Sequence, residues 1–174
     1  MKTTFIETAN GVFTAHFSPL GLAGLEFPNS RRKPPPSLLT AANSTPHLRD
    51  LHERTSAALH QALAGQSPEK PPPLDLSAGS AFQQRVWEVL RTIPRGKTLT
   101  YTEVAAAVGR PKAVRAVGGA CGANPVPVLV PCHRVLAAHG GLGGFSGGLD
   151  WKRALLAREG VPPADNPRGR QESM

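Results

Sequence analysis

The hexapeptide VPCHRV, residues 130–135, places a thiol, an imidazole and a guanidinium at three consecutive positions. Cys132 follows an apolar, β-branched run, where burial raises the pKa of a thiol unless a base or cation offsets the desolvation. His133 is the candidate base. Because neighbours on a strand point to opposite faces, we expect a bridging water rather than a direct bond between thiol and imidazole. The pattern predicts a cysteine nucleophile, although an inert buried cysteine remains the alternative for this hexapeptide alone.

Such a relay needs a carboxylate to orient the histidine. Residues 79–160 contain four acidic residues: Glu88, Glu103, Asp150 and Glu159. Among these four carboxylates, Glu159 on the last predicted helix is the one that the sequence least clearly assigns to another surface. We therefore predict a relay of Cys132, His133 and Glu159, with the sulfur ionised at neutral pH.

Composition limits the class of protein. The 174 residues are 40% hydrophobic, and no stretch reaches the roughly 18 apolar residues of a membrane span. Two cysteines without a CxxC pair fit a reducing compartment, so we expect a cytoplasmic, nucleoid-associated protein. Residues 79–160 hold eleven Lys or Arg against four Asp or Glu, whereas residues 1–78 hold seven against six. This asymmetry favours a nucleic-acid partner, and a basic protein without one is the alternative.

Periodicity and turn signals locate the elements of the first half. Residues 3–28 alternate apolar and polar positions around Asn10-Gly11, which predicts a meander of about three strands. Residues 29–47 read as a loop, and 48–65 as an amphipathic helix. The proline-dense run SPEKPPPLDL indicates a boundary. We predict an N-terminal α+β domain over 1–75, a C-terminal domain over 76–160 and a disordered tail over 161–174.

The second half reads as mainly helical. Ser80 can cap a helix that ends before Pro94, and a last helix runs from 149 to 160. Between them lie a buried strand over 126–130 and two short helices, 101–109 and 111–122, joined at Gly109. Such a pair is typical of a helix-turn-helix, with an ordinary αα-hairpin as the alternative.

The second helix of this pair is unusually poor in long side chains. Small residues let its backbone enter the narrow minor groove of DNA, with little reading of sequence. They are Ala113, Ala116, Gly118, Gly119 and Ala120. Arg115 is the one long residue placed to probe the base stack, although a lone arginine is more often a solvated surface charge.

The runs RAVGGACGANPVPVLVPCHRV and GGFSGGLDWKRALLAREG strongly resemble the O6-alkylguanine-DNA alkyltransferases, or methylated-DNA–protein-cysteine methyltransferases. The likeness extends from Ser80 to Gly160 and is weaker in the first half. It implies an α+β fold with a small antiparallel, ribonuclease-H-like sheet and a helix, followed by a mainly α-helical domain with a winged-helix-like helix-turn-helix.

The resemblance also implies a mechanism. Cys132 attacks the alkyl carbon on guanine O6 in one in-line displacement, so the protein is consumed as a thioether. His133, through water, and Glu159 deprotonate the thiol. Tyr101 donates a proton to the departing guanine, and Asn124 ties the turn before the active-site strand. O4-methylthymine is an additional expected substrate.

Base flipping through the minor groove follows from the same resemblance, because the O6 substituent is crowded within the duplex. Arg115 fills the stack, and the other expected DNA contacts are Thr100, Ala113, Ala116 and Gly118. The guanine pocket is expected to comprise Val130, Val135, Phe145, Ser146 and Gly147. Phe145 stands where many relatives have tyrosine, and Cys121 is interpreted as a packing residue.

We expect double-stranded DNA with alkylated guanine as partner, a monomer, no membrane and no cofactor. No metal is predicted, because residues 1–78 contain no cysteine and their histidines lack ligand spacing. Two other functions stay open. A non-repairing, alkyltransferase-like sensor would bind the damaged base without transfer, and a thiol hydrolase would turn over.

Overall fold

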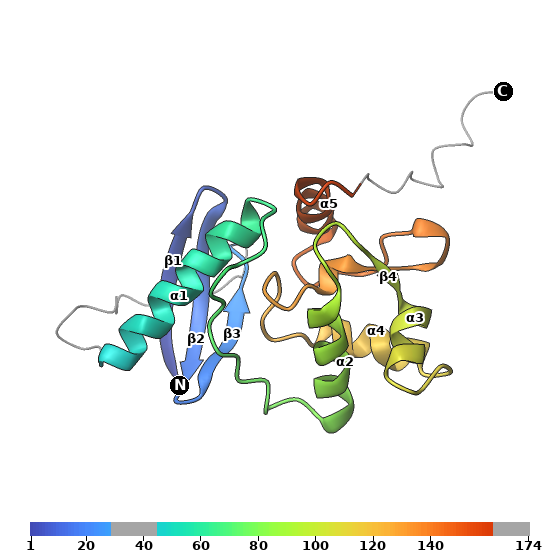
Figure 1. Ribbon diagram of the computed structural model, residues 1–174, viewed down its shortest axis with the longest axis horizontal. Helices are drawn as coiled ribbons and strands as arrows, with labels where there is room; N and C mark the ends of the chain where they lie inside the picture. The colour runs from blue at the N-terminus through green and yellow to red at the C-terminus, as the bar shows by residue number, and fades with distance from the viewer. Residues whose placement is uncertain (29–44, 162–174) are drawn as a thin grey trace. The chain divides into compact units, whose positions relative to one another are not determined.

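The computed structural model describes residues 1–28 and 45–161 (Figure 1). It divides into two compact units. One comprises Met1–Gly79 with Pro125–Leu129, and the other comprises Ser80–Asn124 with the chain from Val130 onward. Most of the predicted loop over 29–47 and nearly all of the predicted tail lie outside the described residues.

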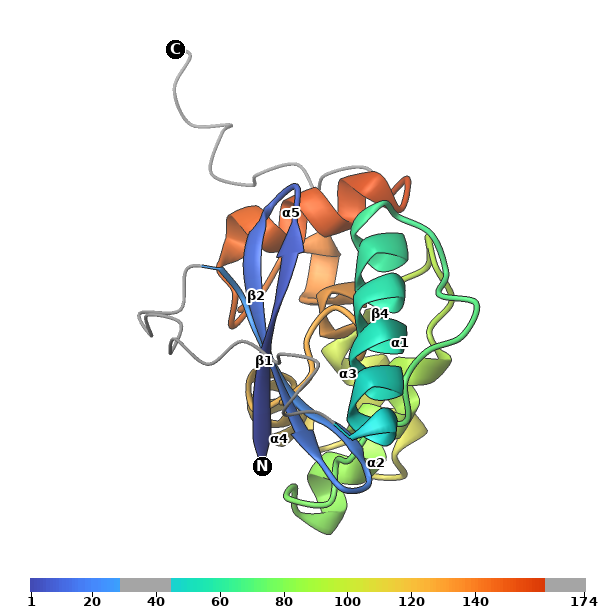
Figure 2. The ribbon, with the colours of Figure 1, turned by 90° about the vertical axis from the view of Figure 1, so that its left-hand side faces the viewer.

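The first unit is an antiparallel sheet covered by one helix. Its strands are β1 (Lys2–Thr8), β2 (Gly11–Ser18) and β3 (Gly21–Glu26), in the order β1-β2-β3. The helix is α1 (Pro46–Leu63), which runs alongside the strands in Figure 2. The predicted meander and helix are confirmed. Alternation along β2 buries Phe13, Ala15 and Phe17 on one face, and α1 contributes Leu51 and Leu59 to the same core.

The second unit is mainly helical. Its elements are α2 (Ala81–Thr92), β4 (Leu99–Thr100), α3 (Tyr101–Ala107), α4 (Val114–Gly122), the 3-10 turns η1 (Cys132–Arg134) and η2 (Ala138–Gly140), β5 (Val135–Leu136) and α5 (Leu149–Arg158). Strand β4 pairs in parallel with β5. Ser80 caps α2 as predicted, through a reciprocal capping box with Gln83. The indole of Trp87 in α2 donates to the Ala120 carbonyl of α4 at 2.8 Å, which joins these helices.

Helices α3 and α4 form the predicted pair, and Gly109 between them has a φ of +73°. Ala105 is fully buried where the helices pack, in keeping with the need for a small residue. The expected start of the second helix at Pro111 is wrong by three residues. Residues 111 and 112 form a turn, closed by a hydrogen bond from the Ala113 amide to the Arg110 carbonyl, and the helix begins at Val114.

The predicted strand over 126–130 is also wrong, because this stretch contains no continuous strand: a bend at Val126 and a turn over 128–129 separate single-residue bridges at 127 and 130. Pro125, Pro127 and Pro131 lack the N–H that a strand ladder needs. Val128 has a φ of +74°, which no extended strand allows. The apolar run is nevertheless buried, so its hydrophobicity reflects core packing without sheet pairing.

The mixed helix and sheet architecture agrees with the α+β prediction. The finer descriptions, ribonuclease-H-like for the sheet and winged-helix-like for the helical pair, stay predictions. None of the helices in residues 1–28 and 45–161 is long and apolar enough to cross a membrane.

Candidate active site

Cys132 opens the 3-10 turn η1, which follows Pro131. The tight turn puts Cys132 and His133 on consecutive positions of a helix-like backbone, where a strand would have sent them to opposite faces. Both side chains are buried, with 4% of Cys132 and 1% of His133 exposed. The local geometry thus differs from the predicted strand end, but it keeps thiol and imidazole in one buried region.

Asn124 ties the chain before this turn. It follows the end of α4 and is 6% exposed. Its side-chain amide donates to the Val130 carbonyl at 2.8 Å and to the Cys132 sulfur at 3.1 Å. One amide therefore fixes the backbone two residues before the cysteine and also contacts the sulfur itself.

Glu159 caps the C-terminal end of α5 and receives both basic side chains of η1. Nε2 of His133 lies 2.9 Å from Oε1 of Glu159. Arg134 donates to both carboxylate oxygens at 2.9 Å, through Nε and Nη2, and to the Ile93 carbonyl at 2.6 Å. The fork geometry of this pair makes it strong and specific. Glu159 and His133 are brought together as predicted, and Arg134 is a partner that sequence reasoning missed.

The ionisation states follow from burial and these contacts. Burial alone would raise the pKa of Glu159, but the hydrogen bonds from His133 and Arg134 outweigh it and lower this pKa to about 2. Burial lowers the pKa of His133 despite its acidic partner. At neutral pH the pair is therefore a carboxylate and a neutral imidazole.

The tautomer of His133 follows from this pairing. An ionised carboxylate only accepts hydrogen bonds, so Nε2 must carry the ring proton. Nδ1 then holds the lone pair of the neutral ring. This atom is buried and has no hydrogen-bond partner among the described residues. Nδ1 is thus the basic atom of the site.

Burial raises the pKa of the Cys132 thiol, although the Asn124 hydrogen bond and the charge of Lys152 favour the thiolate. The resting sulfur is therefore a thiol, where the sequence led us to expect a thiolate. A proton must leave the sulfur when it reacts, and the neutral imidazole is the group able to accept it.

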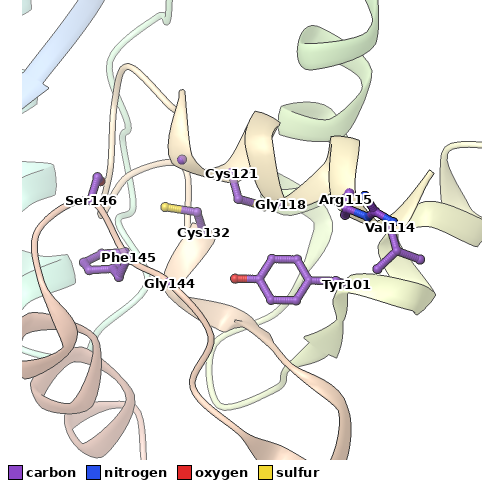
Figure 3. Close-up of a pocket in the computed structure, with 10 residues that line it drawn as sticks. Tyr101, Val114, Arg115, Gly118, Cys121, Cys132, Gly144, Phe145 and Ser146 are labelled. Atoms are coloured by element: carbon purple, nitrogen blue, oxygen red, sulfur yellow. The ribbon is translucent and has the colours of Figure 1, made fainter.

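Cys132 lines a pocket of about 550 Å³ in the second unit (Figure 3). Its wall comes from α3, α4, η1 and the segment before α5: Tyr101, Val114, Arg115, Gly118, Cys121, Gly122, Cys132, Gly144, Phe145 and Ser146. This size suits a small organic ligand. Among the predicted pocket residues, Phe145 and Ser146 are in this lining. Val130, Val135 and Gly147 are not, and both valines are fully buried.

Tyr101 is the first residue of α3, directly after the cap residue Thr100. The Thr100 hydroxyl accepts from the Glu103 amide, and the Glu103 carboxylate accepts from the Thr100 amide, so the start of the helix is well defined. Burial raises the pKa of Tyr101. Figure 3 shows its hydroxyl directed toward the side of the pocket with Cys132 and Gly144. The phenol is therefore protonated at neutral pH and able to donate.

Helix α4 contributes a face of small residues to the other wall. Gly118 lines the pocket, and added Cβ atoms at Gly118, Gly119 or Gly122 would meet nothing within 4 Å. Arg115 and Ala116 are exposed, and Ala113 precedes the helix as its N-cap. Four of the expected DNA-contacting residues thus lie on α4 or at its N-cap, whereas the fifth, Thr100, caps α3.

Two pocket-region residues were not anticipated as functional. Cys121, interpreted as a packing residue, is 7% exposed and also lines the pocket, and burial raises its pKa to about 12. Lys152, fully buried in α5, donates to the Val135 carbonyl at 2.6 Å. Lys152 lies three and four residues before the buried Leu155 and Leu156, so its spacing places it on the buried face of α5, a signal that the sequence analysis did not use.

Over the described part of the chain, no three His, Cys, Asp or Glu side chains gather as metal ligands would. The prediction that the protein has no metal stays a prediction.

The fold is a mixture of helices and a small sheet. Its pocket contains a buried thiol, and the next residue in the chain is a histidine that contacts a carboxylate. Residues 81–161 match the family model described as 6-O-methylguanine DNA methyltransferase, DNA binding domain. The solved Mycobacterium tuberculosis O6-methylguanine methyltransferase is 36% identical with a TM-score of 0.69, over 94% of this chain and 95% of that chain. A Mycobacterium tuberculosis OGT in complex with DNA gives a TM-score of 0.71 at 36% identity, over 94% and 96%. The chain belongs to the O6-methylguanine DNA methyltransferase family.

Curated relatives agree over the second half. The bifunctional transcriptional activator/DNA repair enzyme Ada of Escherichia coli is 53% identical over 87 residues, which are 50% of this chain and 24% of that protein. A methylated-DNA–protein-cysteine methyltransferase of Mycolicibacterium paratuberculosis is 54% identical over 97 residues, 56% of this chain and 58% of that protein. The chain thus spans less than two thirds of the length of these curated relatives.

Proposed function

We propose that the protein repairs DNA by transferring an alkyl group from guanine O6 to its own Cys132, once per molecule and irreversibly. The observation that carries this proposal is the placement of Cys132 in a pocket, directly before His133 in the chain, whose neutral imidazole a buried carboxylate orients. Methyl transfer to a cysteine is the activity named for the curated relatives.

The chemistry balances with these groups alone. The thiol proton passes to Nδ1 of His133, and a bridging water is the proposed relay. Sγ of Cys132 then bonds to the alkyl carbon while the carbon–O6 bond breaks in line. The electron pair moves into the purine, and the Tyr101 phenol protonates a ring nitrogen, so that a neutral guanine leaves. An anionic base would be costly to hold in this largely apolar pocket.

Access to O6 requires the nucleotide to leave the helix, because its paired base crowds that position. We propose that α4 enters the minor groove and that Arg115 takes the place of the extruded nucleotide. The small residues of α4 support this proposal, since an added Cβ at Gly118 or Gly119 finds open space rather than protein. A helix with so few long side chains on this face can approach the minor groove, which is only about 6 Å wide.

Alkyl transfer can be tested by mass spectrometry after incubation with duplex DNA containing one O6-methylguanine. Trypsin cleaves after Arg115 and Arg134, so a single peptide carries both Cys121 and Cys132. That peptide should gain about 14 Da, the mass of the CH₂ added when a methyl group replaces the thiol proton. Fragmentation should place the gain on Cys132.

Matched variants separate the two thiols. Cys132→Ser should abolish the gain, whereas Cys121→Ser should keep it. An unmodified peptide after full incubation would reject the proposal, and tight binding of methylated DNA without transfer would favour a sensor. Product beyond one equivalent per protein would favour a thiol hydrolase. O4-methylthymine, proposed as a second substrate, can replace O6-methylguanine in the same assay.

A further inference from the structure

Lys152 is a buried cation in α5 that the proposed chemistry does not use. The residue is 0% exposed. Its ammonium donates to the carbonyls of Val135 at 2.6 Å, of Leu142, and of Gly144 at 3.5 Å. No carboxylate pairs with it among the residues that the structure describes. Burying an ammonium is expensive, so its partners must compensate that cost.

Two of these carbonyls flank Gly143, which lies directly against Tyr101. Gly143 has a φ of +67°, and a Cβ there would come within 2.8 Å of the phenol oxygen and 2.9 Å of Cε2 of the ring. The segment that Lys152 holds is therefore the surface on which the tyrosine ring rests.

The ammonium faces the same ring from α5. Nζ of Lys152 lies 6.0 Å from the centroid of the Tyr101 ring, within the range of a weak cation–π contact. The lysine thus reaches Tyr101 in two ways, through the 142–144 backbone and across the ring face. Gly144 and the adjacent Phe145 line the pocket, so this backbone also shapes the wall opposite α4.

We infer that Lys152 is a positioning residue, which fixes the Tyr101 phenol for proton transfer by holding the carbonyls on both sides of Gly143. This inference rests on the proposed alkyl transfer, in which the phenol is the proton donor. Its geometric part, the placement of the ring, stands independently of that function and can be measured without DNA.

The environment of the Tyr101 ring can be measured directly by NMR, because Tyr101 is the sole tyrosine of the chain. Protein labelled with 3-fluorotyrosine therefore reports Tyr101 alone in its ¹⁹F spectrum. Lys152→Met removes the three donated hydrogen bonds, and the Tyr101 signal should shift or broaden. The control Arg153→Met removes a neighbouring cation of α5 that is exposed and paired with Asp150, and it should leave the signal unchanged.

A second variant disturbs the ring without removing the charge, which matters because the ammonium also favours the Cys132 thiolate. Gly143→Ala places a methyl group against the phenol, and it should move the same ¹⁹F signal. Gly141→Ala is its control, because a Cβ there meets only ordinary contacts, at 3.5 Å or more. Gly143→Ala tests only the contact between this backbone and the ring, so if Lys152→Met does not fold, Lys152→Gln, which keeps side-chain N–H donors but loses the charge and some reach, takes its place and should also shift the Tyr101 signal.

Rates of methyl transfer test whether the lysine acts through the tyrosine. Lys152→Met should slow transfer by at least about tenfold in the wild-type background and by less than about threefold beside Tyr101→Phe. Equal factors in both backgrounds, with an unchanged ¹⁹F signal, would overturn the inference. If wild-type protein transfers no methyl group, the proposed function fails, and the ¹⁹F comparison alone decides whether Lys152 places the ring.

Discussion

Replacing Glu159 by glutamine tests the charge at the centre of the buried His133–Glu159–Arg134 cluster. The carboxylate accepts one hydrogen bond from His133 and two from Arg134, each at 2.9 Å. Glutamine keeps the shape of the side chain but loses the charge and one acceptor oxygen. The variant therefore leaves a partly buried guanidinium without its counter-ion.

The magnitude follows from the pKa of Glu159, which falls from an ordinary 4.5 to about 2 in the folded protein. At 1.36 kcal/mol per unit, this shift corresponds to about 3 kcal/mol of stability at neutral pH. A carboxyl group with a lowered folded pKa contributes fully above pH 4.5. The contribution declines as the pH falls toward 2, and about 2 kcal/mol of it is lost by pH 3.

Urea unfolding at pH 6 and at pH 3 measures this contribution. At pH 6, Glu159→Gln should be less stable than wild type by about 3 to 5 kcal/mol, as for other broken buried ion pairs. At pH 3 the gap should narrow by about 2 kcal/mol, because the carboxyl group of the unfolded wild-type chain is then largely protonated, while that of the folded protein is still mostly ionised. The control Glu88→Gln, on the exposed side of α2, should follow wild type at both pH values. A gap of equal size at pH 6 and pH 3 would refute the reasoning.

Three further predictions concern the proposed role of Arg115 in base flipping, the hydrogen bonds of Asn124 and the cap of α2. Arg115→Ala should slow methyl transfer from duplex DNA by at least about tenfold, because the duplex requires base flipping. The same variant should hardly change the reaction with free O6-benzylguanine, which needs no flipping. Equal losses of rate with both substrates in single-turnover assays would contradict this prediction. Asn124→Ala removes the hydrogen bonds to Val130 and Cys132, so transfer should slow by about tenfold or more, whereas Asn10→Ala, in the β1–β2 turn, should not slow it. Ser80→Ala removes the cap of α2 and should lower the free energy of unfolding by about 1 kcal/mol in urea, without changing the transfer rate.

Several elements could be predicted from local signals because their causes are local. The cap residue Ser80 and the stop signals at Pro94 and Gly109 act within one turn of the chain, and the observed helices end at or near them. The strand meander could also be predicted, because successive side chains of β2 alternate between the core and the outer face. Capping and alternation depend on near neighbours and need no knowledge of the tertiary structure.

The apolar run over 126–130 shows where such local signals fail. Its β-branched residues favour a strand, yet three prolines and the left-handed backbone of Val128 prevent one. Periodicity reports burial, and burial alone does not distinguish a strand from a packed turn. The consequence for the site was large, because the 3-10 turn and not a strand end sets how Cys132 and His133 are placed.

By itself the sequence determined the reactive group and its neighbours along the chain, since Cys132, His133 and Arg134 are adjacent and their chemistry belongs to the side chains. The tertiary structure decided which groups reach them from afar. Lys152 and the C-cap Glu159 belong to a helix that begins some fifteen residues after the turn. The sequence proposed Glu159 as the partner of His133, and the tertiary structure gives the contact between them, whereas the place of Lys152 beside Tyr101 was found only in the tertiary structure. Folding also reinforces the ionisation states, because burial raises the pKa of Cys132 and lowers that of His133, which keeps the sulfur a thiol and the imidazole neutral.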